Sequence, residues 1–96
     1  MTILNKVAHA FQTSPQSILR ESLRTYLKQK LIHVESEMFI LAKKYGVQNV
    51  LELDAKVQQG LFHEQETSED YFRMDHLETE QDKIKQLLDT YNGNNN

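Results

Sequence analysis

Cysteine and tryptophan are absent from the 96-residue chain, which contains only one proline and three glycines. Without cysteine the protein has no disulfide, no thiolate ligand for zinc and no cysteine nucleophile. So few glycines and prolines argue against a sheet-rich fold, because each reversal between strands needs turn residues. With 39% hydrophobic residues in so short a chain, we expect one small domain with a thin core. The fold class that this composition favours is all-α.

Long hydrophobic runs are also absent. Nothing in the chain approaches the run of about 18 apolar residues that a membrane-spanning helix needs. Residues 1–11 are too short and too polar for the apolar part of a signal peptide. The lack of cysteine agrees with a reducing compartment. We therefore expect a soluble cytoplasmic protein that does not enter a membrane.

Helical periodicity and capping residues divide residues 1–92 into four expected helices that form one domain. Ser14 followed by Pro15 is typical of a helix start, because serine caps free N–H groups and proline fits the first turn. Gly46 is typical of a helix end. The expected helices span residues 2–12, 15–45, 50–59 and 68–91, and residues 93–96 are expected to form a disordered tail.

The starts of the two later helices are predicted from polar residues. Asn49 is the expected cap of a short helix that ends near Gly60. Thr67 is the expected cap of the last helix, with Asp70 completing a weak capping box. The polar residues before Thr67 are expected to form a loop.

Two apolar seams with heptad spacing lie on the two long expected helices, and Leu19 and Leu23 extend the first of them backwards. The seam residues are Leu27, Leu31, Val34, Met38, Leu41 and Tyr45 on the first helix and Met74, Leu77, Ile84 and Leu88 on the second, with Tyr91 beyond them. Seams of similar length predict an antiparallel helical hairpin with a short connecting helix and a short N-terminal helix. The alternative is that the seams pair between chains, and we expect a homo-oligomer. Gln81 lies in the second seam, where one polar residue commonly sets register or partner choice.

No motif for catalysis or metal binding is present. None of the four histidines has another histidine three or four residues later, which a helical zinc site would need. Ser14 is explained by capping, and no nucleophile elbow or phosphate-binding glycine loop occurs. Carboxylates are abundant between residues 64 and 82, but a solvated acidic surface does not raise a carboxyl pKa for acid catalysis. We expect a non-enzymatic protein without a metal or another cofactor.

Charge is distributed unevenly along the chain. Residues 1–44 carry a net charge of +4 and residues 45–96 carry −7. On the long helix Arg20, Arg24 and Lys28 are spaced by four and form one stripe. That stripe either contacts nucleic-acid phosphates or is a solubilising surface, and the sequence leaves direct nucleic-acid binding open.

The acidic block between residues 64 and 82 interleaves carboxylates with aromatic residues, which predicts an interface with a basic protein. The alternative is a solvated face beside seam residues. The candidate partner-binding residues are Glu66, Glu69, Asp70, Tyr71, Phe72, Asp75 and Glu78.

Two stretches, "VESEMFILAKKYGVQNVLELDAKVQQG" and "HEQETSEDYFRMDHLE", carry a resemblance to known proteins. They are similar to small helical antitoxin-like proteins of bacteria and archaea, over roughly residues 18–90. The shared positions are Glu35, Glu37, Lys44 to Val47, Glu52 to Asp54, Gly60, Glu66, Thr67, Glu69, Asp70 and Asp75 to Glu78. Proteins of this kind are often encoded beside a small toxin-like protein. The resemblance implies an interaction module that neutralises a small basic partner, such as an RNase toxin, through its acidic C-terminal half. A self-assembling structural oligomer is the alternative, followed by a nucleic-acid-binding regulator that uses the basic stripe.

Overall fold

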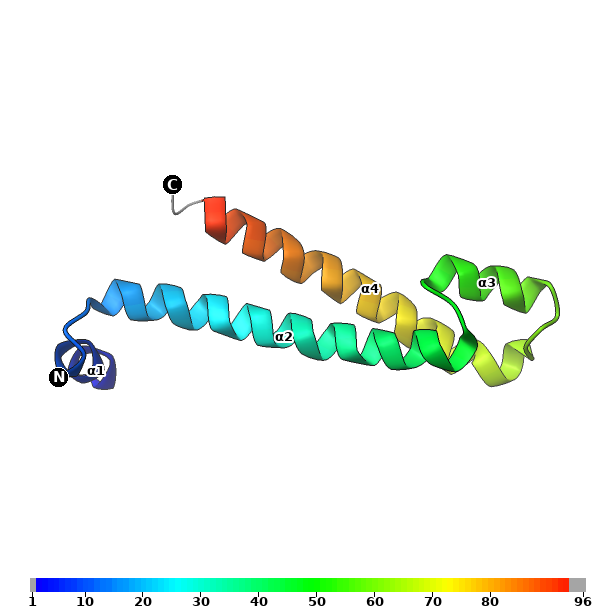
Figure 1. The fold of residues 1–96 in the computed structure, drawn as a ribbon, viewed down its shortest axis with the longest axis horizontal. Coiled ribbons are helices and arrows are strands. Elements are labelled where there is room, and N and C mark those ends of the chain that lie inside the picture. Colours follow the sequence, from blue (N-terminus) through cyan, green and yellow to red (C-terminus); the bar gives the residue numbers. More distant parts are fainter. Residues whose placement is uncertain (1, 94–96) are drawn as a thin grey trace.

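The computed structural model describes residues 2–93, apart from the side chains of residues 64, 66, 92 and 93. This part of the chain contains helices and no strand. The helices are α1 (Ile3–Ala10), α2 (Pro15–Tyr45), α3 (Val50–Gln58) and α4 (Glu64–Gly93). Figure 1 shows α2 and α4 as the antiparallel arms of a hairpin, with α3 at the end where they join and α1 at the other end of α2. The predicted all-α helical hairpin is confirmed.

The long helix α2 begins and ends at the residues that the sequence indicates. The Ser14 hydroxyl oxygen accepts a hydrogen bond from the Ser17 N–H at 3.0 Å, and Pro15 follows in the first turn. Gly46 has a φ of 64°, a left-handed conformation in which a Cβ is disfavoured. The N–H of the following residue, Val47, donates a hydrogen bond to the Ala42 carbonyl at 2.9 Å. The chain therefore leaves the helix axis at Gly46 and turns toward α3.

The capping role predicted for Thr67 was wrong, because α4 begins earlier, at Glu64. Thr67 is buried, and both its N–H and its hydroxyl donate to the His63 carbonyl, at 3.0 and 2.9 Å. This hydroxyl-to-carbonyl bond is a pattern of helix interiors. The acidic residues that precede Thr67 suit the positive end of the helix dipole, so the expected polar loop is the first turn of the helix. Asp70 does not cap the start of α4, and its carboxylate instead accepts hydrogen bonds from Lys44 and Tyr45 of α2.

The other helix limits differ by a few residues from those expected. Helix α1 ends at Ala10, because Gln12 adopts a φ of 54° and the chain turns before Ser14. Helix α3 starts after Asn49, whose side-chain oxygen accepts from the Glu52 N–H at 2.9 Å as predicted. Gly93 belongs to α4 rather than to the expected tail, and residues 94–96 lie outside the described part of the chain.

The core consists of two neighbouring clusters. The first joins the end of α2, the connector, α3 and the start of α4, and its buried members are Tyr45, Val47, Val50, Leu53 and Met74. The second lies along α2 and α4, with Val34, Leu77 and Ile84 buried and the other seam residues Leu27, Leu31, Met38, Leu41 and Leu88 partly buried around them. The seam residues therefore pack against one another within one chain.

The two ends of the molecule differ in how closely their helices pack. Residues 38–76 form what we call the clasp end, where the deepest side chains lie. Toward the other end α2 and α4 diverge (Figure 1). The Arg24 guanidinium is stacked over the ring of Tyr91 in the last turns of α4. Residues of α2 before Arg24 therefore lie beyond the reach of α4, and we call them, together with α1, the open end. The molecule measures 61 Å along its longest axis.

Candidate protein-binding groove

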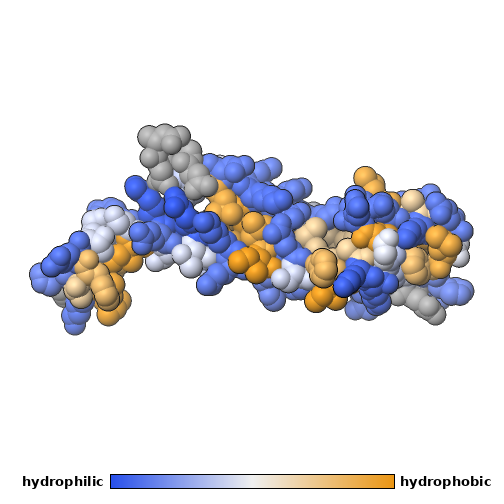
Figure 2. Space-filling view, viewed as in Figure 1, coloured by the Kyte–Doolittle hydropathy of each residue, from blue (hydrophilic) through white to orange (hydrophobic). Residues whose placement is uncertain are grey.

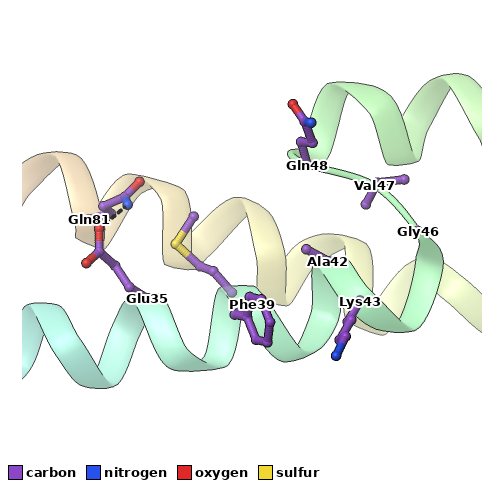
Figure 3. Close-up of a pocket in the computed structure, with 9 residues that line it drawn as sticks. Glu35, Phe39, Ala42, Lys43, Gly46, Val47, Gln48 and Gln81 are labelled. Atoms are coloured by element: carbon purple, nitrogen blue, oxygen red, sulfur yellow. Dashed lines mark hydrogen bonds between the residues drawn. The ribbon is translucent and has the colours of Figure 1, made fainter.

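A groove with a volume of about 510 Å³ lies at the clasp end. It is formed by the second half of α2, the connector to α3 and one residue of α4. Figure 3 shows the nine residues that line it: Glu35, Met38, Phe39, Ala42, Lys43, Gly46, Val47, Gln48 and Gln81. We call this feature the clasp groove.

The clasp groove has an apolar floor and a polar rim. Met38 belongs to the core, whereas the neighbouring Phe39 ring is 64% exposed although it lies on a folded helix. Exposed aromatic side chains are enriched among the anchor residues of protein–protein interfaces. At the rim the Glu35 carboxylate accepts a hydrogen bond from the Gln81 amide at 2.7 Å, drawn as a dashed line in Figure 3. The Lys85 ammonium lies 3.8 Å from the same carboxylate.

Three carboxylates form a stripe on α4. Asp75, Glu78 and Asp82 are spaced by three and four, so they form one stripe on that helix. Glu78 accepts a hydrogen bond from the Val50 N–H at 2.7 Å and thereby holds the start of α3 against α4. Two carboxylates of this stripe, Asp75 and Asp82, therefore remain exposed to solvent.

Two smaller grooves lie next to these elements. One, of about 220 Å³, lies between α3 and α4 and includes Asp54, Tyr71 and the strongly exposed Phe72. The other, of about 430 Å³, continues along α2 from the clasp groove, shares Phe39 and Glu35 with it, and adds Ile32. Exposed aromatic side chains therefore border grooves on two sides of the clasp end.

The structure divides the predicted partner-binding face into two groups. Asp70, Tyr71 and Glu78 serve the fold, because Asp70 and Glu78 bond to other elements and Tyr71 packs on the core. Glu69, Phe72 and Asp75 are exposed and available to a partner. The side chain of Glu66 lies outside the described residues.

Asp70 joins the two long helices at the clasp end. Its carboxylate accepts hydrogen bonds from the Lys44 ammonium at 2.6 Å and from the Tyr45 hydroxyl at 2.5 Å. These two donors, Lys44 first, hold the pKa of Asp70 below its ordinary value. Burial, together with the bond to Asp70, raises the pKa of Tyr45. The cluster is a structural link, since every polar group in it has a partner within the chain.

A second link between the helices lies further along the hairpin. Arg73 donates to the Glu37 carboxylate through Nε at 3.1 Å and through a terminal nitrogen at 2.5 Å. His33 lies one turn away on α2, with Nε2 3.1 Å from the same carboxylate group. Hydrogen bonding from Arg73 is the main reason why the pKa of Glu37 is lowered. Arg73 is the one lysine or arginine between residues 64 and 82, and its guanidinium is paired within the chain.

The predicted basic stripe is not uniform. Arg20 and Lys28 are exposed, but Arg24 is turned toward α4, with its guanidinium carbon 5.8 Å from the centre of the Tyr91 ring. The stripe therefore offers two free cations to an anionic ligand, and the third packs against an aromatic ring.

Phe39 lines the clasp groove, but the sequence analysis predicts no role for it. It lies one position after Met38, outside the heptad seam, and the seam pattern alone gives it no role. The signal that indicates it is a second spacing of seven, from Ile32 to Phe39, on the flank of the same helix. Both side chains are exposed.

Within residues 2–93, as far as their side chains are described, no three histidine or carboxylate side chains are grouped to hold a metal ion. None of the helices described is long and apolar enough to cross a membrane. By its fold the chain is an elongated all-α helical hairpin with a groove at its closed end.

A protein-family model matches the chain over residues 1–96, and the chain belongs to the family described as Uncharacterized protein MJ0235 family. Comparisons with curated proteins and with solved structures found no match.

Proposed function

We propose that the protein is a non-enzymatic interaction module of the antitoxin-like kind, which binds and neutralises a small basic protein through its acidic C-terminal half. The observation that carries this proposal is the clasp groove, where the exposed Phe39 ring borders an apolar floor, and α4 adds the exposed carboxylates of Asp75 and Asp82. Such a surface suits a partner that inserts an apolar side chain and surrounds it with lysine or arginine.

The charge of the chain supports a basic partner. Residues 45–96 carry −7, and Arg73 within this region is already paired with Glu37. Asp75 and Asp82 are exposed, so like charges repel one another on one surface until a partner neutralises them. Complementary charge raises the rate of association and excludes acidic proteins.

An RNase toxin is a partner of this chemistry. A protein that binds RNA presents a basic surface to the phosphates. An acidic module that covers this surface blocks access of the RNA without any chemical step. In this role the antitoxin-like protein needs a rigid acidic surface and no catalytic residue. The carboxylates of α4 suit this role, because some are exposed and others, such as Asp70 and Glu78, link the helices.

The experiment mixes the purified protein with the product of the neighbouring gene and measures ribonuclease activity and binding by calorimetry. We expect a complex whose affinity falls as salt increases, together with loss of nuclease activity. Phe39→Ala and the double variant Asp75→Asn with Asp82→Asn should each weaken binding at least about tenfold, as expected for interface anchors.

Leu51→Ala is the matched control, because Leu51 is also strongly exposed but lines none of the grooves described above. This variant should bind like the wild type. Full nuclease activity in the mixture without any complex, or equal binding by the Phe39 and Leu51 variants, contradicts the proposed function.

A further inference from the structure

The smaller groove between α3 and α4, of about 220 Å³, combines aromatic rings with a carboxylate. Asp54 lines it from α3, and Tyr71 and Phe72 line it from α4. The centroids of the two rings are 5.5 Å apart, and the ring planes lie at 85° to each other. In Figure 2 hydrophobic side chains reach the surface among hydrophilic ones at this end of the molecule. We call this feature the α3–α4 groove.

The two rings of the α3–α4 groove have different surroundings. Tyr71 packs against the core, so the fold fixes its position. Phe72 is 68% exposed and is held by its edge-to-face contact with Tyr71. The face of a phenyl ring carries partial negative charge and attracts a cation. The groove therefore presents an aromatic ring that remains accessible to a charged ligand.

Carboxylates surround the Phe72 ring. Glu69 precedes Phe72 by three positions and Asp75 follows it by three, so both exposed carboxylates lie on the same side of α4 as the ring. Asp54 is oriented by the Gln58 amide, which donates to its Oδ2 at 3.1 Å. The ion pairs formed among the described residues include none of these three carboxylates. Their charges are therefore available to a ligand at the ring.

The nearest lysine and arginine along the chain are bound elsewhere. Arg73, next to Phe72, is paired with Glu37 of α2. The Lys56 ammonium donates to the carbonyls of Tyr45 and Gly46, at 3.3 and 2.9 Å. Among the described residues, no lysine or arginine lines the α3–α4 groove. The groove therefore combines an aromatic ring and negative charge without a cation of its own.

The clasp groove differs in this respect. Its exposed ring, Phe39, already has a cation from the chain, because the Lys43 ammonium lies 5.4 Å from the ring centre and Lys43 also lines that groove. A cationic side chain of a partner meets a like charge there, whereas at Phe72 it meets carboxylates. The clasp groove thus suits an apolar side chain, and the α3–α4 groove suits a cationic one.

We propose that the α3–α4 groove binds an arginine side chain of a basic protein. The identity of this occupant rests on the function proposed above. The flat guanidinium stacks on the Phe72 ring and donates to the Asp54 carboxylate, while Glu69 and Asp75 add attraction from either side. Arginine suits the site better than lysine, because its planar group contacts an aromatic face and offers paired N–H donors. This groove then distinguishes basic partners from other proteins that carry an apolar anchor.

The first experiment titrates the isotope-labelled full chain with N-acetylarginine amide, follows amide signals by NMR, and needs no partner protein. We expect saturable shifts around Asp54 and Phe72. N-acetylcitrulline amide has nearly the same shape without the charge and should cause none. Phe72→Leu keeps an apolar side chain but removes the aromatic face, and it should weaken binding of the arginine probe at least about threefold. Phe39→Leu is the matched control and should leave binding of this probe unchanged.

The second experiment measures binding of the neighbouring gene's product by calorimetry. Phe72→Leu and Asp54→Asn should each weaken the complex at least about threefold. Leu51→Ala should bind like the wild type, and circular dichroism checks that the variants fold. A partner affinity unchanged by Phe72→Leu overturns the partner's arginine as the occupant.

The two experiments separate failure of this proposal from failure of the proposed function. Equal shifts with the arginine and citrulline probes, shifts spread over the whole acidic surface, or probe binding insensitive to Phe72→Leu each overturn the arginine site, even if the partner complex forms. Saturable probe binding at Phe72 without any partner complex supports the site and contradicts the proposed function.

Discussion

The two ends of the hairpin show how one sequence pattern leads to opposite outcomes. At the clasp end the seams of α2 and α4 meet, α3 closes the core, and Leu53 and Met74 are buried almost completely. At the open end the same type of seam continues on α2, but Leu19 and Leu23 are half exposed because α4 does not extend that far. A heptad pattern predicts that a helix has an apolar side, whereas the length of the neighbouring helix decides whether that side is buried.

The largest contrast between the ends should appear on truncation of apolar side chains. Leu53→Ala should lower the free energy of unfolding by about 2–5 kcal/mol, because it leaves a cavity in the clasp core. Leu19→Ala, measured at a concentration at which the chain is monomeric, should change it by no more than about 0.5 kcal/mol. Urea unfolding followed by circular dichroism measures both values. Similar losses in the two variants would contradict the division into a packed end and an uncovered end.

The next effect concerns the turn on which the clasp end depends. Gly46 adopts a φ of 64°, and the Lys56 ammonium bonds to the Gly46 carbonyl at 2.9 Å. Gly46→Ala should cost about 1–2 kcal/mol, because the new Cβ disfavours the left-handed backbone. The loss should appear in the thermal unfolding midpoint. Gln59→Ala, at the far end of α3, is the control and should have a smaller effect; an unchanged midpoint for Gly46→Ala would show that the turn can relax without cost.

The smallest effect concerns the pH dependence of the clasp end. Bonds from Lys44 and Tyr45 hold the pKa of Asp70 below 3.8, and Arg73 holds the pKa of Glu37 below 4.5. A carboxyl group with a lowered folded-state pKa stabilises the fold above its ordinary pKa and loses this contribution as pH falls through the folded value. Stability should therefore fall below about pH 4, from the ordinary carboxyl values.

Asp70→Asn tests this dependence, because an amide does not titrate. The variant should be less stable than the wild type at pH 7 and should lose less stability on acidification. Asp75→Asn removes an exposed carboxylate from the same helix and serves as the control. The thermal unfolding midpoints of the three proteins are measured between pH 2.5 and 7, the range in which carboxylates titrate. Parallel curves for the wild type and Asp70→Asn would contradict a stabilising role for the link.

Much of the fold could be predicted from sequence because its signals are local. Ser14, Pro15 and Gly46 define α2 at both ends, since each residue satisfies a backbone requirement that does not depend on the rest of the chain. The seams predict the hairpin because their spacing and lengths match. Thr67 was misassigned because a threonine followed by acidic residues is typical of a cap, whereas here it is buried and bonds within the helix.

The candidate site was harder to predict, because it depends on contacts between distant residues. Asp70 and Glu78 look like members of an acidic surface, but one pairs with Lys44 and Tyr45 and the other caps α3. Phe39 lies beside the seam, and the course of the connector after Gly46 completes the clasp groove next to it. Residue type and spacing alone do not show which charged groups already have partners.

The length of α2 separates the two ends of the molecule. Phe39 lies sixteen positions after Leu23, which corresponds to about 24 Å along the helix axis. A small protein that fills the clasp groove therefore leaves the start of α2 in solvent, and a fluorescent label attached there reports binding without obstructing it.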